Sequence, residues 1–166
     1  INVSPQETAV AHNLTVRENL ELIAGLYGND RASARSKAAD MLTRFRLEDE
    51  ANSRAKKLSG GMQRRLSIAM ALISEPRILF LDEPTLGLDV LARRELWKMI
   101  EQLKGDITII LTTHYMEEAE ALSDRIGIMQ RGKLTAIGTA RQFIQQTGAA
   151  NFEEAFVQLA NEEEAI

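Results

Sequence analysis

Residues 78–84 read ILFLDEP, four apolar residues followed by two carboxylates and a proline. So uniform an apolar run predicts a strand at residues 78–81 that is buried on both faces of a parallel sheet. Residues 107–111, which read ITIIL, predict a second strand of the same kind. A helical pattern over residues 91–103 lies between them, and this alternation indicates an α/β fold. In such sheets, ligands bind beyond the carboxyl ends of the strands.

Two adjacent carboxylates, Asp82 and Glu83, come directly after the first predicted strand. Buried anions need a cation or hydrogen-bond donors, so a purely structural role is hard to explain. Successive strand residues point to opposite sides, and the pair should therefore divide two tasks. Asp82 is suited to hold Mg²⁺, largely through water, and Glu83 to orient and deprotonate an attacking water. The alternative is that the pair caps a helix beginning near Pro84.

A glycine pair opens the helix expected after residue 58, where the sequence reads LSGG. Gly60 and Gly61 let the backbone approach a ligand closely, and the free N–H groups of a helix N-terminus favour an anion. Ser59 adds a hydroxyl donor. An ordinary serine N-cap is the alternative, but it requires no glycines, each of which costs up to ~1 kcal/mol in a helix. The segment is therefore a candidate phosphate site.

Two further polar residues are candidates for the same site. His114 follows the second predicted strand, which places it at the same sheet edge as Asp82. A lone histidine is more often an ordinary polar residue, but its place directly beyond a buried strand favours contact with a phosphate. Asp89 either caps the helix that follows it or has a functional role, and the two interpretations are equally supported.

The flanking segments are predicted to be mainly helical. Thr15 and Glu18 form a T-x-x-E capping box at the start of one helix, and a second amphipathic helix covers residues 32–46. This region is expected to be a small helical lobe without strands. The C-terminal tail places three apolar residues on one helical face, namely Phe152, Phe156 and Leu159.

Composition narrows the classes of function. The chain has 166 residues, a net charge of -4 and no cysteine. Hydrophobic residues make up 45% and charged residues 27%, as in an ordinary globular protein. The charge gives no reason to expect nucleic acid as a partner, and the lack of cysteine excludes disulfide and cysteine–zinc frameworks. No run approaches the roughly 20 apolar residues that cross a bilayer, so a role at a membrane would come through a partner.

The chain resembles the ATP-binding cassette (ABC) ATPases through five short motifs in the family's order and spacing. The resemblance runs from Ile1 to about Gly138 and implies a P-loop NTPase fold, with a parallel-sheet core and a helical subdomain, truncated at the N-terminus. The matching motifs are the Q-loop (PQ, residues 5–6), the signature motif (LSGGMQ, 58–63), Walker B (ILFLDEP, 78–84), the D-loop (GLD, 87–89) and the H-loop (TTH, 112–114).

The resemblance also implies a division of the chain. Asp89, the hairpin sequence QRGK and the phenylalanine-containing tail are most like the ATPases of bacterial ABC-2 type exporters. The implied segments are the Q-loop segment (residues 1–7), the helical subdomain (8–57), the remainder of the ATPase core (58–138) and a C-terminal helical tail (139–166).

By the same resemblance, the cofactors are ATP and Mg²⁺. Asp82 would serve Mg²⁺, Glu83 would be the catalytic base, and His114 would sense the γ-phosphate. Gln6 would contact Mg²⁺ or the water and relay the nucleotide state to a membrane subunit.

The remaining residues imply partners. Ser59, Gly60 and Gly61 would bind the γ-phosphate of ATP held by an opposite subunit, and Asp89 would act across the dimer. That subunit is a second copy or a second ATPase subunit in a head-to-tail arrangement. The other partner would be an ABC-2 type membrane permease, which would hold the chain in the cytoplasm at the inner face of the cell membrane.

A P-loop requires the pattern G-x-x-x-x-G-K-[ST] between a strand and a helix. The nearest match, GIMQRGKL at residues 127–134, lacks the final Ser or Thr. Strand-like residues fill its loop, and a hairpin turning at Arg131 and Gly132 is the better interpretation. We therefore expect the P-loop, and the aromatic residue that stacks on adenine, upstream of Ile1. The chain alone is expected to be inactive.

Two other functions are alternatives to a transporter ATPase that drives export. One is a non-transport cassette ATPase acting in translation or DNA maintenance, but the tandem cassettes, zinc modules and long coiled coils of such proteins do not occur in this sequence. The other is a non-catalytic docking fragment whose helical lobe binds a partner. The intact Asp82, Glu83 and His114 disfavour that alternative.

Overall fold

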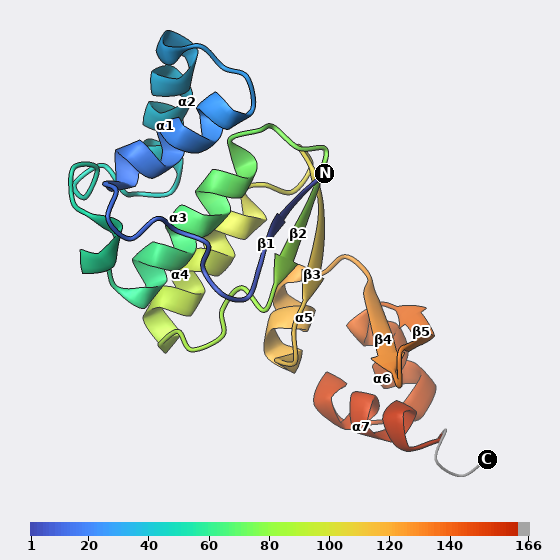
Figure 1. Cartoon of the computed structure of the whole chain (residues 1–166). Helices are drawn as coiled ribbons and strands as arrows, with labels where there is room; N and C mark the ends of the chain where they lie inside the picture. The colour runs from blue at the N-terminus through green and yellow to red at the C-terminus, as the bar shows by residue number, and fades with distance from the viewer. Residues whose placement is uncertain (163–166) are drawn as a thin grey trace. The chain divides into compact units, whose positions relative to one another are not determined.

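The computed structural model describes residues 1–162, and the chain forms two compact units, Ile1–Thr112 and Thr113–Ile166 (Figure 1). The first unit holds both predicted strands and the helical lobe. Its elements are β1 (Asn2–Ser4), α1 (Val16–Leu26), α2 (Arg31–Arg44), the short 3-10 helix η1 (Ala55–Lys57), α3 (Gly60–Leu72), β2 (Ile78–Asp82), α4 (Val90–Glu101) and β3 (Thr108–Thr112).

A three-stranded parallel sheet in the order β1-β2-β3 forms the centre of the first unit (Figure 1). In its register, Phe80 lies between Val3 and Ile110. Helix α4 connects β2 to β3, as a parallel crossover requires. The α/β fold with a parallel sheet, predicted from the alternation of helix and strand, is confirmed.

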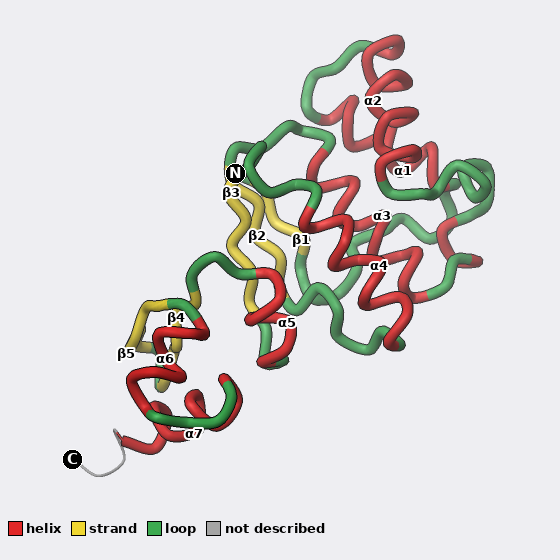
Figure 2. The backbone as a smooth tube through the Cα atoms, turned by 180° about the vertical axis from the view of Figure 1, so that it is seen from behind, coloured by secondary structure: helices red, strands yellow, loops and turns green. Residues whose placement is uncertain are grey.

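Helices α3 and α4 form a layer on one face of this sheet, as the two opposite views in Figures 1 and 2 show. Leu79 and Leu81 are buried and alternate along β2 with the half-buried Ile78 and Phe80. Because strand side chains alternate between faces, the two leucines face the helical layer.

The prediction that both strands are buried on both faces is wrong for this unit. β3 spans Thr108–Thr112 and its residues alternate between half-buried and exposed, with Ile110 43% exposed. β3 is an edge of the described sheet, and α3 and α4 cover only one of the two faces. Residues on the other face therefore keep contact with solvent.

The helical lobe consists of α1 and α2, which pack against each other, and α1 also packs against α3. The predicted capping box is present: the Glu18 amide donates to Thr15 Oγ1 at 3.1 Å, and the Thr15 amide donates to Glu18 Oε2 at 2.7 Å. The backbone hydrogen bond from Thr15 lowers the pKa of the Glu18 carboxyl. Asp30 caps α2 in a similar way through the Ser33 amide.

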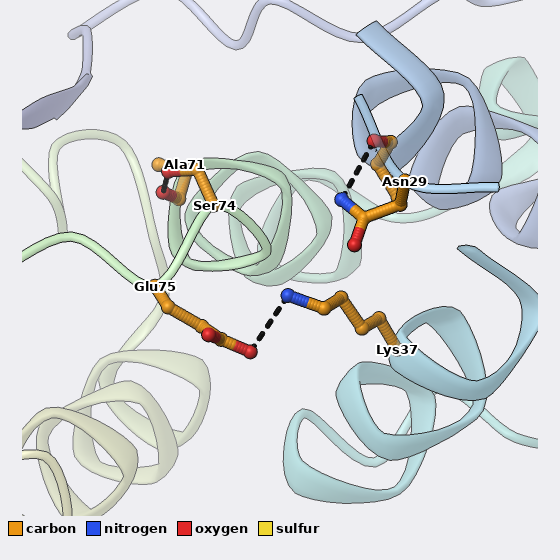
Figure 3. Close-up of polar contacts among 6 residues, drawn as sticks. Asn29, Lys37, Ala71, Ser74 and Glu75 are labelled. Atoms are coloured by element: carbon orange, nitrogen blue, oxygen red, sulfur yellow. Dashed lines mark hydrogen bonds and ion pairs between the residues drawn. The ribbon is translucent and has the colours of Figure 1, made fainter. Parts of the chain in front are cut away.

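One ion pair joins the lobe to the end of α3 (Figure 3). Lys37 Nζ lies 2.7 Å from Glu75 Oε1, across 38 residues of sequence. Exposed pairs of this kind contribute little stability, typically below about 1 kcal/mol. Figure 3 also shows Asn29, whose side-chain amide donates to the Ala24 carbonyl and so closes the C-terminal end of α1.

The second unit contains the predicted hairpin. Arg131 and Gly132 form the turn, with φ of 49° and 77°, and their left-handed conformations suit a tight hairpin turn. The interpretation of residues 127–134 as a hairpin is therefore confirmed. The elements of this unit are α5 (Met116–Leu122), β4 (Ile126–Gln130), β5 (Lys133–Gly138), α6 (Ala140–Thr147) and α7 (Phe152–Glu162).

The core of the second unit forms around two aromatic rings. Phe143 of α6 and Phe152 of α7 are stacked, with centroids 6.1 Å apart. Phe156 and Leu159 pack against the same core, which confirms the apolar face predicted for the tail. Among residues 1–162, no helix combines the length and the apolar character needed to cross a membrane.

Candidate functional site

The two carboxylates lie at the carboxyl end of β2. Asp82 is the last residue of the strand and is paired in register with Thr112, the last residue of β3. The Thr112 hydroxyl donates to Asp82 Oδ1 at 2.5 Å. The amide of Glu83 donates to the Thr112 carbonyl at 3.0 Å, so the chain remains attached to β3 for one residue beyond β2.

Glu83 adopts a left-handed conformation, with φ of 45°. A non-glycine residue in this region costs on the order of 1–3 kcal/mol and persists only where its surroundings hold it. The next residue, Pro84, restricts it further. The turn directs the chain away from the strand, and the Leu86 amide closes it by donating to the Glu83 carbonyl at 3.2 Å.

The alternative in which Asp82 and Glu83 cap a helix near Pro84 is wrong. The residues after Glu83 form a turn, and the next helix, α4, begins at Val90. Its N-cap is Asp89, whose Oδ1 accepts hydrogen bonds from the amides of Leu91 and Ala92 at 2.9 and 3.0 Å. The capping interpretation of Asp89 is therefore confirmed, and its action across a dimer stays a prediction.

Ser59 is the N-cap of α3, and its hydroxyl accepts a hydrogen bond from the Met62 amide at 3.2 Å. The two glycines that follow differ in their surroundings. A Cβ added to Gly61 would lie 3.2 Å from the Ala92 Cβ of α4, so Gly61 allows the two helices to pack closely. A Cβ added to Gly60 would meet nothing within 4 Å. Packing against α4 therefore explains why residue 61 is a glycine, but packing gives no reason for a glycine at residue 60.

Sequence reasoning missed Arg64. It lies one turn after Gly60 on α3 and is 4% exposed. Its guanidinium donates to the backbone carbonyls of Asp82, Glu83 and Pro84 at 2.8, 2.6 and 2.7 Å. The available signal was helical spacing, because Arg64 shares the core-facing stripe of α3 with buried residues three, four, seven and eight positions later.

Gln6 and His114 complete the predicted set. Gln6 is exposed and follows Pro5, whose carbonyl accepts a hydrogen bond from Arg64 Nη1 at 2.5 Å. His114 belongs to the second unit, where its ring centroid lies 4.1 Å from that of Tyr115. The structure thus joins the Gln6 loop, the carboxylate pair and the α3 N-terminus within one unit, and the approach of His114 to them stays a prediction.

The donor set suits a weakly held divalent cation. Among residues 1–162, no three His, Asp or Glu side chains are arranged to hold a metal. Mg²⁺ ordinarily uses one or two carboxylates together with water and substrate phosphates, so a single carboxylate such as Asp82 fits it. Bound there, Mg²⁺ would neutralise charge on a triphosphate.

The parallel sheet and the carboxylates at its edge place the chain in the P-loop NTPase class of α/β proteins. The sequence model of the family described as "ABC transporter" matches residues 1–86. A solved structure described as "Structure of ATP binding subunit of ABC transporter" is 32% identical, with a TM-score of 0.78 over 95% of this chain and 67% of that one. The chain belongs to the ABC transporter family and carries part of its ATP-binding domain.

Curated relatives agree with this assignment. "Phospholipid-transporting ATPase ABCA3" of Homo sapiens is 44% identical over 149 residues. "ABC transporter A family member 11" of Arabidopsis thaliana is 48% identical over 140 residues. The two alignments cover 90% and 84% of this chain, but it spans only 9% and 15% of the relatives' lengths.

Proposed function

We propose that this chain is part of the ATP-hydrolysing subunit or domain of a transporter that exports its substrate. The observation that carries the proposal is the arrangement at the end of β2, where Asp82 accepts a hydrogen bond from Thr112 and Glu83 leaves the strand through a left-handed turn. Two carboxylates at this edge are suited to ATP hydrolysis, because one can bind the hydrated cation and the other can accept a proton from the attacking water.

In this proposal, Asp82 orients the hydration shell of Mg²⁺, and Glu83 accepts the proton of the attacking water. Gln6 contacts the same water or cation from the loop after β1. His114 contacts the γ-phosphate from the segment after β3. Proximity of these residues to one triphosphate is required, since the reaction depends mainly on positioning and charge stabilisation.

The partners follow from the N-terminus of α3. Ser59, Gly60 and Gly61 bind the γ-phosphate of ATP on an opposite ATPase subunit in a head-to-tail dimer, and Asp89 acts across that interface. The surroundings of Gly60 support this role, because a Cβ built on it would meet no atom of the described residues within 4 Å, which leaves room for a ligand.

A membrane permease of the ABC-2 type would carry the transported substrate and would hold the chain at the inner, cytoplasmic face of the membrane. The division into residues 1–7, 8–57, 58–138 and 139–166 belongs to the same proposal.

We further propose that residues 1–166 do not hydrolyse ATP by themselves. The pattern G-x-x-x-x-G-K-[ST] does not occur in them, and the nearest match is the β4–β5 hairpin. Without a P-loop lysine and its glycine-rich backbone, the β- and γ-phosphates lack their main donors.

The test compares the 166-residue chain with the protein expressed from the complete open reading frame that encodes it. We expect no turnover above background for the chain, and Mg²⁺-dependent turnover for the complete protein that is lost on Glu83→Gln. Glu83→Gln should still bind ATP, which separates loss of chemistry from loss of folding. Turnover by the chain alone would contradict its proposed inactivity. A complete protein that neither binds nor hydrolyses ATP would contradict the ATPase, and co-purification with ribosomes or DNA would contradict transport.

A further inference from the structure

Arg64 stands out among the described residues because it is a buried arginine bonded to the backbone of two separate segments. Arginine is rarely fully buried unless its guanidinium is paired. Here it donates to three consecutive carbonyls, those of residues 82–84, and to the Pro5 carbonyl before Gln6. These partners lie 18 to 20 residues and 59 residues away in sequence.

The guanidinium shape suits this set of acceptors. Its donors point in fixed directions within one plane, so one group can bond to several carbonyls at once. Nε reaches Pro84, Nη2 reaches both Asp82 and Glu83, and Nη1 reaches Pro5. A lysine ammonium at the same place has three donors at a single point and cannot bridge both segments.

The bonds act where the backbone is under strain. Glu83 is left-handed and precedes a proline, and its carbonyl receives one of the shortest bonds, 2.6 Å from Arg64 Nη2. A strained conformation persists only when its surroundings determine it. Arg64 and the β3 carbonyl that accepts from the Glu83 amide hold the two sides of this residue.

Further contacts join α3 to β1 along the same line. Ser67, three residues after Arg64, has its hydroxyl 3.2 Å from that of Ser4. The Asn2 side chain donates to the Ala71 carbonyl at 2.9 Å. Since helix α3 begins at Gly60, its N-terminus is connected to both the Gln6 loop and the carboxylate turn through one rigid element.

We propose that Arg64 is a positioning residue: it sets the backbone of residues 82–84 and of Pro5 relative to α3, and so fixes where Glu83 and Gln6 can lie. The part of this inference that concerns catalysis rests on the proposed ATPase function. In the proposed reaction, Arg64 contacts neither the nucleotide nor the attacking water, and it acts only through the backbone segments to which it is bonded.

The first experiment uses the 166-residue chain and does not depend on ATP. Amide hydrogen exchange is compared for the wild type, Arg64→Lys and a matched control, Arg65→Lys. Arg65 is the next residue and also donates to backbone carbonyls, but to those of Phe45 and Arg46 at 3.3 and 3.4 Å.

We expect Arg64→Lys to speed exchange of the Glu83 and Leu86 amides by about tenfold or more, as local opening becomes easier. Arg65→Lys should leave these amides unchanged. If the two variants exchange alike at Glu83, or if Arg64→Lys speeds exchange equally throughout the chain, the positioning role is wrong.

The second experiment uses the complete protein. We expect Arg64→Ala to lower kcat on the order of a hundredfold with KM for ATP nearly unchanged, since small misplacements of reacting groups cost this much. Guanidinium ions, at concentrations far below those that unfold proteins, should restore part of kcat, and sodium at equal ionic strength should not. Absence of rescue would contradict the role. If the wild type itself shows no turnover, the ATPase proposal fails and the exchange comparison alone decides on Arg64.

Discussion

The Thr112 hydroxyl donates a hydrogen bond of 2.5 Å to Oδ1 of Asp82, and the two residues are register partners at the ends of β3 and β2. The bond fixes the carboxylate that we propose to serve Mg²⁺. It also makes Thr112, which none of the sequence arguments assigned a role, a member of the site.

Replacing Thr112 with valine removes this donor but keeps the side-chain shape. Because Thr112 is exposed, its hydrogen bond to Asp82 should contribute less than the usual value for a bond to a charged group. We therefore expect the loss of the hydroxyl to weaken Mg²⁺ binding by about 1 kcal/mol. The Mg²⁺ concentration for half-maximal turnover of the complete protein should rise about fivefold. Thr112→Ser keeps the hydroxyl and should behave like the wild type. An equal shift in both variants would show that the hydroxyl is not responsible.

The two glycines of α3 should respond differently to alanine. Gly61→Ala places a Cβ 3.2 Å from the Ala92 Cβ, closer than most such contacts, so α4 must shift by a few tenths of an ångström. We expect this to offset the gain of up to ~1 kcal/mol that alanine otherwise has over glycine in a helix, so that Gly61→Ala has a lower free energy of unfolding than Gly60→Ala. Gly60→Ala meets open space and should leave stability unchanged or slightly higher. Denaturant unfolding of the 166-residue chain measures both.

For the complete protein, Gly60→Ala should nevertheless reduce turnover strongly, because the added methyl group stands where we place the phosphate. Comparing the unfolding free energy with the turnover of Gly60→Ala distinguishes an effect on phosphate binding from an effect on folding. A Gly60→Ala protein with normal turnover would remove Gly60 from the site.

Asp89 has a structural role that must be kept apart from any functional one. Asp89→Ala removes the cap of α4 and should cost about 1 kcal/mol of stability. Asp89→Asn retains an acceptor for the Leu91 and Ala92 amides and should keep nearly full stability. If Asp89→Asn also lowers turnover of the complete protein, the charge itself acts in the reaction or the dimer. Normal turnover would leave Asp89 as a cap alone.

The capping box of α1 predicts a pH dependence for the helical lobe. The pKa of Glu18 is lowered, chiefly by the hydrogen bond from the Thr15 backbone, so the charged form is favoured in the folded state. Its contribution is therefore present above the unfolded pKa of the carboxyl and is lost as the pH falls through the lower folded pKa.

We accordingly expect the wild type to be more stable than Glu18→Gln at neutral pH, with the difference shrinking on acidification below the ordinary glutamate range. Thermal unfolding across this range measures it. Glu21 lies on the same helix at a half-buried position outside the box, and Glu21→Gln serves as the control. If the difference in stability between the wild type and Glu18→Gln did not change with pH, the charged Glu18 carboxylate would not be what stabilises the cap.

Features with local causes could be predicted from the sequence. The Thr15–Glu18 box involves residues three apart, and the hairpin turn at Arg131 and Gly132 depends on two adjacent left-handed residues. The exposure of Ile110 could not be predicted in this way. An apolar strand looks the same in sequence whether helices cover one face of the sheet or both, and the cover over β3 depends on how distant elements pack.

The sequence by itself determined the α/β class, the order of the motifs and, through them, the family. Only the tertiary structure decided which group holds the carboxylate turn in place. Helical spacing can show that Arg64 faces the core, but its partners are the carbonyls of Pro5 and of residues 82–84, and every residue carries a carbonyl. Which carbonyls lie opposite the guanidinium is set by the left-handed turn at Glu83 and by the packing of α3 on the sheet, and neither is a property of any short stretch of sequence.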